Sequence, residues 1–161
     1  MFVILYKKGG KKIKTLQSGK LILDGIIFIL DDCSDTKFFI FDSDEKEGTI
    51  AICFDILFQS KEYKNETIVP FLSIQKHETG KLNIDELIGC KYIVENIEDV
   101  VVREDTLCIY EHEPMEKYSF TIIEILDNLV HIQLEGVAII DGYTDLYEIA
   151  DFFGDVWLRY K

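Results

Sequence analysis

The sequence predicts a mainly β domain of the α+β kind, in which hairpins build antiparallel sheets that form a sandwich or a partly open barrel, with one or two short helices. Three observations predict it. Apolar and polar residues alternate over most of the chain. Turn sequences containing Gly, Asp or Asn separate the alternating segments. Segments with helical spacing and recognisable caps are few and short.

Length and composition predict a single domain covering residues 1–161. A chain of 161 residues can bury a core large enough to need neither disulfides nor a structural metal. It contains only two Pro and ten Gly, and no Ser- or Pro-rich stretch suggests a linker.

The clearest alternation lies in residues 49–58, where Ile52 and Phe54 share one face with the other even-numbered apolar residues. This pattern predicts a strand with one face in the core. Residues 37–41 form a second apolar run, and the polar segment 42–48 joins the two. We therefore expect a hairpin.

Two longer runs, 118–126 and 129–140, flank Asp127 and Asn128, a pair suited to a two-residue turn. The apolar parity of the first run breaks after Ile122, which predicts a bulge or a strand buried on both faces. The residues expected to face inward on the second run are Val130, Ile132 and Leu134.

Residues 100–102 and 107–110, two apolar runs around the polar segment 103–106, are interpreted as a further hairpin. The last residues, 155–161, contain Trp157 and are expected to return to the sheet.

Helices are predicted at two places. Asn83 is a suitable cap for a short helix over 84–88. Residues 145–153 have a cap at Asp145, apolar residues at helical spacing and Gly154 just beyond, so we assign a helix there, with a strand over 146–152 as the alternative.

The charge is acidic and unevenly distributed. The chain has 30 acidic and 17 basic residues and a net charge of −13. Residues 1–20 contain six Lys and no acidic residue, whereas residues 82–161 contain eighteen acidic and five basic residues. Such a field repels nucleic acid and anionic membranes and attracts cations. We therefore expect a basic protein as partner, and neither nucleic acid nor membrane.

Four cysteines, at wide spacing and without a CxxC pair, indicate reduced thiols and a cytoplasmic protein. The apolar segment 21–30 is interrupted by Asp24 and is too short to span a membrane. The first residues do not have the order of a secretory signal, because the apolar stretch precedes the charges.

No compact catalytic, metal-binding or phosphate-binding motif is present. Cys108 and His112 suggest a thiol–imidazole pair, but in an extended strand four residues span about 13 Å, too far for a nucleophile and its base. Glu111, His112 and Glu113 are interpreted as a solvated strand end before Pro114, since neighbouring side chains of a strand point to opposite faces. The sequence thus predicts no catalytic residue, no cofactor and no metal.

Aromatic residues are expected mainly in the sheet core. Trp157 is assigned to the core, whereas Tyr110, Tyr118 and Tyr147 are expected near the surface because acidic residues are close to them in sequence.

The segment Gly136–Tyr143, followed after a gap by Asp155–Leu158, resembles the end of polymorphic-toxin immunity proteins of bacteria. The similarity covers about the last quarter of the chain and includes no catalytic residue. It implies a non-enzymatic cytosolic protein that binds and blocks a toxin.

Together these observations predict an acidic immunity protein that occludes a cognate toxin, possibly a basic nuclease, through carboxylates of its acidic half. Two alternatives stay open: a small-molecule-binding β-barrel or sandwich, and a carboxylate-based hydrolase. The residues predicted to contact the partner are Glu98, Asp99, Glu104, Asp105, Glu111, Glu113 and Glu116.

Overall fold

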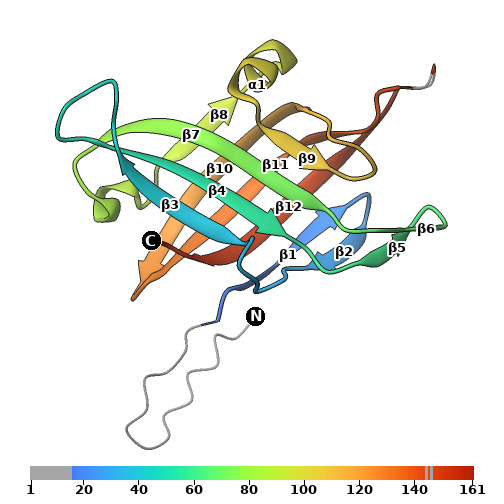
Figure 1. Ribbon diagram of the computed structural model, residues 1–161, viewed down its shortest axis with the longest axis horizontal. Helices are drawn as coiled ribbons and strands as arrows, with labels where there is room; N and C mark the ends of the chain where they lie inside the picture. The colour runs from blue at the N-terminus through green and yellow to red at the C-terminus, as the bar shows by residue number, and fades with distance from the viewer. Residues whose placement is uncertain (1–15, 144, 146) are drawn as a thin grey trace, which may run out of the picture.

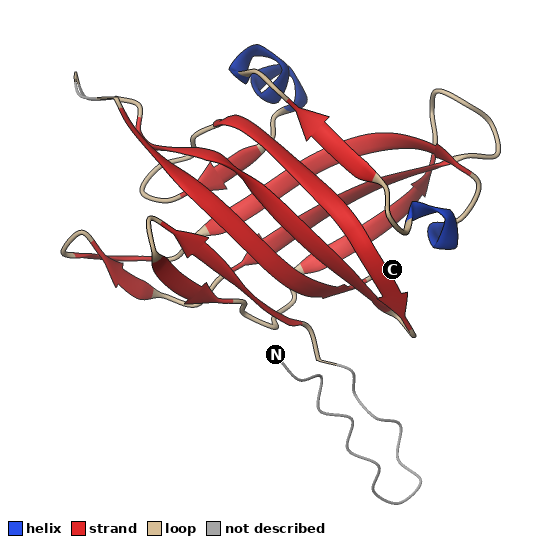
Figure 2. Cartoon of the chain, turned by 180° about the vertical axis from the view of Figure 1, so that it is seen from behind, coloured by secondary structure: helices blue, strands red, loops and turns tan. Residues whose placement is uncertain are grey.

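The computed structural model describes residues 16–143, 145 and 147–161. Strands make up 62% of it and helices 8%, and the sheets are antiparallel, so the prediction of a mainly β sandwich is confirmed (Figures 1 and 2). The lysine-rich residues 7–14 lie outside the described residues.

A six-stranded sheet has the order β2-β1-β12-β11-β10-β8. Its strands are β1 (Ser18–Leu23), β2 (Ile26–Ile29), β8 (Lys91–Val94), β10 (Met115–Leu126), β11 (Leu129–Asp141) and β12 (Glu148–Arg159). A four-stranded sheet has the order β3-β4-β7-β9 and lies across it. Its strands are β3 (Lys37–Asp42), β4 (Ile50–Leu57), β7 (Phe71–Lys81) and β9 (Thr106–Cys108).

A small hairpin, β5 (Lys61–Tyr63) and β6 (Glu66–Ile68), projects from one end of the molecule. Two short helical segments, the 3-10 helix η1 (Ile84–Leu87) and the α-helix α1 (Ile97–Arg103), lie in the connections on either side of β8. No helix among the described residues is long and apolar enough to cross a membrane.

The core fills the space between the two sheets. One hydrophobic cluster contains residues from both, and the ring of Phe54 in β4 meets that of Phe120 in β10 edge-on, with centroids 5.1 Å apart. The alternation predicted for residues 49–58 is confirmed, since Ile52, Phe54 and Ile56 are fully buried and Asp55 is not.

Both predicted long hairpins are confirmed. β3 pairs with β4, and β10 pairs with β11 around Asp127 and Asn128. The register shifts between Ile122 and Glu124, at the place where the broken parity predicted a bulge. The short helix capped by Asn83 is also present as η1, because the Asn83 side chain accepts hydrogen bonds from the amides of the first turn.

The helix predicted over residues 145–153 is wrong. Residues 148–159 form β12, which is hydrogen-bonded along one edge to β11 and along the other to β1. Gly154, which suggested a helix stop, lies in the middle of β12. A Cβ at this position would be 2.7 Å from the Leu134 side chain, so glycine fits here without displacing it. Pairing with two distant strands overrides the local helical spacing, and residues 155–161 return to the sheet as predicted.

The hairpin predicted around residues 103–106 is also wrong, because residues 97–103 form α1. Asn96 caps its first turn by accepting a hydrogen bond from the Asp99 amide, and Glu104 ends it in the left-handed conformation with φ 61°. These two caps outweigh the low helix propensity of the three valines.

Candidate partner-binding site

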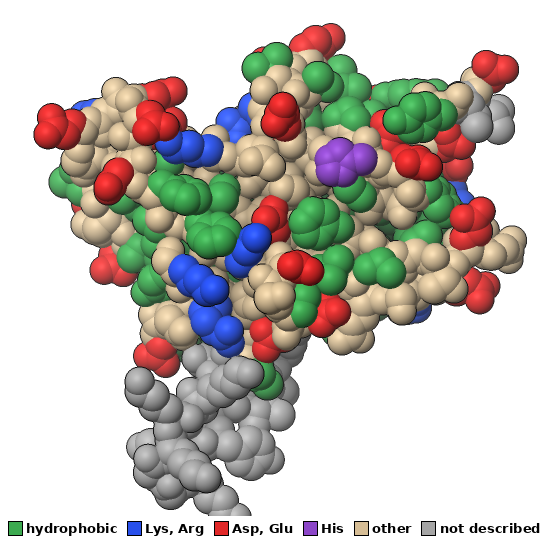
Figure 3. Space-filling model, viewed as in Figure 1, with side chains coloured by type: hydrophobic (Ala, Val, Ile, Leu, Met, Phe, Trp, Pro, Cys, Tyr) green, Lys and Arg blue, Asp and Glu red, His purple; other side chains and the backbone are tan. Residues whose placement is uncertain are grey.

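Charge is distributed unevenly over the surface. On the face shown in Figure 3, most Lys and Arg side chains lie left of the centre, and Asp and Glu side chains lie at both ends, including the right-hand end. That end contains β6, the loop after β9 and the far ends of β11 and β12 (Figure 1).

Three of the predicted partner-contacting carboxylates lie at α1. Glu98 and Asp99 are in its first turn, where carboxylates interact favourably with the helix dipole, and Glu104 is its C-cap. Asp99 also accepts a hydrogen bond from the Asn96 side chain at 2.9 Å. The stabilisation of α1 therefore explains in part why carboxylates occur at positions 98 and 99.

The prediction that Asp105 contacts a partner is wrong, because its side chain is completely buried. Its Oδ1 accepts a hydrogen bond from the Gln75 amide at 2.7 Å, and its Oδ2 accepts one from Arg103 Nε at 2.7 Å and another from the Tyr118 hydroxyl. Burial raises the pKa of Asp105, although these donors act in the opposite direction. The carboxylate joins α1 to β7 and β10.

His77 completes this group, which we call the buried clamp: His77, Arg103, Asp105 and Tyr118. The His77 Nε2 atom lies 2.9 Å from the Tyr118 hydroxyl, and burial, together with the charge of Arg103, lowers the pKa of His77 to about 3. Tyr118 was expected near the surface but is only 3% exposed, because it faces the space between the sheets. The acidic residues close to it in sequence gave no information on which side of β10 it occupies.

Cys108 and His112 are in contact, contrary to the prediction from strand spacing. The Sγ and Nδ1 atoms are 3.0 Å apart, because the chain leaves β9 after Cys108 and turns back before Pro114. Burial nevertheless raises the pKa of the Cys108 thiol. A nucleophilic cysteine needs a lowered pKa, so this pair lacks the usual feature of an activated thiolate.

A pocket of about 640 Å³ lies at the acidic end of the molecule, and we call it the acidic end pocket. It is formed by β6, the loop between β9 and β10, the end of β11 and the residues that follow. None of the described residues that line it is basic. The lining consists of Glu66, Tyr110, Glu111, Glu113, Ile140, Asp141 and Tyr143.

Glu113 is the most buried carboxylate of this pocket, with 9% of its surface exposed. Its Oε1 atom has no hydrogen-bond partner among the described residues. The carboxylate lies against Gly142, where an added Cβ would be 2.9 Å from Oε1 and 3.0 Å from Oε2. The absence of a side chain at Gly142 thus leaves room for the charged group.

Two tyrosines border the acidic end pocket. Tyr110 is held by a hydrogen bond from its hydroxyl to the Tyr63 carbonyl at 3.4 Å, and burial and then Glu66 raise its pKa. Tyr143 is 78% exposed. Tyr110 and Tyr147, both expected near the surface, are partly exposed, as predicted from the sequence.

Glu116 lies beside this pocket without lining it. It accepts a hydrogen bond from the Tyr147 hydroxyl at 2.5 Å, and that bond is the main cause that raises the pKa of Tyr147 to about 12, with Glu113 a smaller one. The structure therefore gathers Glu111, Glu113 and Glu116 at one end and leaves Glu98, Asp99 and Glu104 at α1.

The sequence interpretation missed Glu66, Tyr110, Asp141 and Tyr143 as members of one site. Asp141 and Tyr143 belong to the segment that carried the resemblance to immunity proteins, which was the only signal available for them. Glu66 joins them through the projecting β5–β6 hairpin, which no local pattern placed beside β11.

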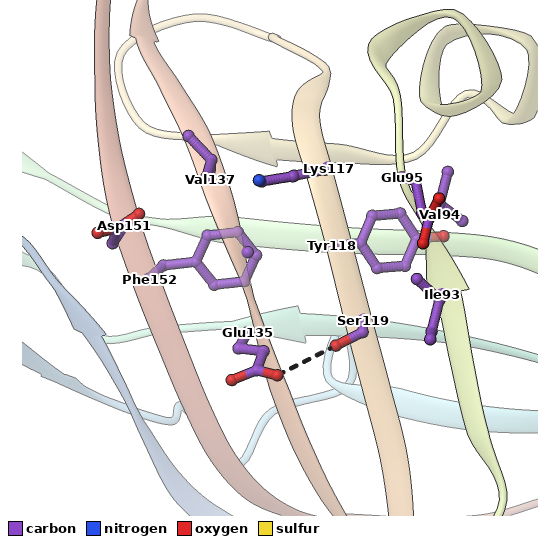
Figure 4. A pocket seen from close by; sticks show the side chains of 11 residues that line it. Ile93, Val94, Glu95, Lys117, Tyr118, Ser119, Glu135, Val137, Asp151 and Phe152 are labelled. Atoms are coloured by element: carbon purple, nitrogen blue, oxygen red, sulfur yellow. Dashed lines mark hydrogen bonds between the residues drawn. The ribbon is translucent and has the colours of Figure 1, made fainter.

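A second concavity, of about 630 Å³, crosses β8, β10, β11 and β12 (Figure 4). Its lining mixes charges, with Lys117 among Glu95, Glu135 and Asp151. Ser119 donates to Glu135 at 3.4 Å across its floor. Because charged groups line it, it differs from the enclosed apolar cavity expected of a lipid-binding or aromatic-binding sandwich.

Among residues 16–143, 145 and 147–161, no three His, Cys, Asp or Glu side chains are arranged to hold a metal ion. Comparisons with protein-family models, with curated proteins and with solved structures find no match for this chain.

Proposed function

We propose that this protein is a non-enzymatic immunity protein that binds a basic toxin domain and covers its functional surface. The observation that carries the proposal is the acidic end pocket, where four carboxylates and two tyrosines meet without a basic residue in the lining. The net charge of −13 supports it.

The physical basis is charge complementarity. Nuclease domains carry positive charge because they grip phosphate, so an acidic protein is attracted to them over long range and can cover the same groove. Such steering raises association rates, while buried aromatic and charged contacts set the rate of dissociation. Tyr110 and Tyr143 supply aromatic surface of the kind enriched at interfaces.

The test is co-expression with the product of the neighbouring gene. We expect rescue of growth and co-purification of the two proteins. The association rate constant should fall by about tenfold or more as salt is raised from low to physiological concentrations, since exposed charges are then screened. A partner that fails to co-purify, or an association rate unaffected by salt, would count against the proposal.

A carboxylate-based hydrolase is the second candidate, and the convergence of Glu66, Glu111, Glu113 and Asp141 favours it. Glycoside hydrolysis needs one carboxyl group as acid and another as base or nucleophile across a cleft. Release of reducing ends from a panel of oligosaccharides, lost in Glu113→Gln, would support that function over inhibition of a toxin.

A further inference from the structure

The acidic end pocket contains a buried carboxylate, that of Glu113, whose hydrogen bonding is incomplete among the described residues. Glu113 is nine-tenths buried and its Oε1 accepts no hydrogen bond from the described residues. Burying an unpaired carboxylate costs free energy, and unsatisfied groups of this kind need an explanation. Glu113 also lines a pocket of about 640 Å³. Because Oε1 itself has almost no accessible surface, a ligand that enters supplies the missing donor only once the flexible end of this side chain turns toward the pocket.

The residues around Glu113 favour a positively charged ligand. Glu66, Glu111 and Asp141 add negative charge around Glu113, so an anion is repelled and a cation is attracted. The rings of Tyr110 and Tyr143 border the same space. A cation over a tyrosine ring gains a further favourable interaction.

We infer that the acidic end pocket receives an arginine side chain of the basic partner, with the guanidinium facing Glu113. The inference rests on the proposed function and specifies which side chain the partner inserts. It makes Glu113 the central anchor of the interface, with Tyr110 and Tyr143 as its aromatic walls.

Guanidinium fits this lining better than the other available cations. A metal ion would need several carboxylate ligands arranged around one point, and the described residues contain no such group. A lysine ammonium is a compact, strongly hydrated charge. The planar guanidinium is more weakly hydrated, pairs with carboxylates through two donors and stacks on aromatic rings, which together match Glu113 and the two tyrosines.

The experiment uses the full chain and N-acetyl-L-arginine amide as a probe, followed by ¹H–¹⁵N NMR. We expect saturable shifts of the amides of residues 110–113 and 140–143 at millimolar probe. The citrulline analogue has the same shape without the charge, and it should bind at least about tenfold more weakly. The lysine analogue should also bind more weakly than arginine.

Glu113→Gln keeps the size of the side chain and removes its charge, so it should weaken arginine binding by about tenfold. Tyr143→Ala alters a residue that is 78% exposed, so it tests the pocket without disturbing the core and should weaken binding several-fold. Glu98→Gln on α1 is the matched control and should bind like the wild type.

Absence of saturable shifts, equal binding of citrulline or of the lysine analogue, or an unchanged affinity in both Glu113→Gln and Tyr143→Ala would overturn the inference. These measurements need no toxin. A negative result beside intact co-purification would therefore remove the arginine site alone, whereas loss of co-purification with a positive probe titration would remove the toxin partner alone.

Discussion

Two buried carboxylates occupy opposite situations in this molecule. Asp105, in the buried clamp, accepts hydrogen bonds at both oxygens, from the Gln75 amide, Arg103 and Tyr118. Glu113, in the acidic end pocket, has an Oε1 atom without a partner among the described residues. The Asp105 carboxylate thus has hydrogen-bond donors at both oxygens, whereas the Glu113 carboxylate lacks one at Oε1.

The difference separates structure from recognition. A buried carboxylate with matched donors stabilises the fold, because removing it leaves its partners buried and unpaired. A buried carboxylate with an oxygen that lacks a donor is costly in the free protein, and under the role inferred for Glu113 that donor is supplied only on binding. Depth of burial does not distinguish the two roles, whereas the count of donors does.

Replacement of Asp105 should have the largest effect on stability. Asp105→Ala leaves Arg103 and Tyr118 without their shared acceptor, so we expect a loss of about 3–5 kcal/mol in the free energy of unfolding. Urea denaturation measures it. The exposed neighbour Glu104 is the control, and Glu104→Gln should change stability by less than about 0.5 kcal/mol. A loss below about 1 kcal/mol in Asp105→Ala would contradict a structural role for this carboxylate.

The buried clamp should also make stability depend on pH. His77 has a folded pKa of about 3, against an ordinary value of 6.5, so the unfolded chain binds its proton first as the pH falls. Stability is therefore lost between about pH 6.5 and pH 3, and the loss from His77 should reach about 2 kcal/mol by pH 5.

Unfolding of the wild type and of His77→Gln at pH 7 and pH 5 isolates this contribution. Asp105 acts in the opposite sense, because its raised pKa lets the folded protein take up that proton first, and subtraction of the two proteins removes most of its effect. Identical slopes in the wild type and His77→Gln would contradict the role of His77.

Gly142 controls the space available to the Glu113 carboxylate. In Gly142→Ala the new methyl group would meet the Glu113 carboxylate at about 2.9 Å, so the carboxylate must shift. We expect a change of about 1 kcal/mol or less in stability, because the end of a flexible side chain can move. Affinity for the partner or for an arginine probe should fall several-fold, as titration would show. Unchanged affinity would mean that the position of this carboxylate is unimportant.

Neutralisation of Glu113 should have the smallest effect on folding and the opposite sign to that at Asp105. Glu113→Gln removes an unmatched buried charge, so stability should be unchanged or rise by up to about 1 kcal/mol. Thermal unfolding at pH 7 measures it. Destabilisation as large as that of Asp105→Ala would show that Glu113 has structural partners after all.

The sequence predicted those parts of the fold that depend on short-range pattern. β4 alternates cleanly, and the β10–β11 hairpin has its turn residues and its broken parity in place. The first half of β12 was predicted as a helix, with a strand only as the alternative, because its apolar residues fit both, and only pairing with β1 and β11 decides between the two. α1 was missed because its caps compete with a run of three valines.

The candidate site was predicted in part for a similar reason. Glu111 and Glu113 are close in sequence and both reach the acidic end pocket. Glu66 and Asp141 arrive there from distant segments, which no local pattern reveals. Asp105 stands among exposed acids in the sequence, and only the position of Tyr118 on the opposite sheet shows that it is buried.

The placement of β12 has a consequence for biosynthesis. Ser18 pairs with Trp157, so β1 has only β2 beside it until residues 148–159 have left the ribosome. Pairings of such long sequence separation form slowly. The six-stranded sheet therefore closes only after residues 148–159 have been translated, and under the proposed function the capacity to inhibit would lag behind synthesis. Under the proposed function, a cell would need a standing reserve of this protein before its toxin arrives.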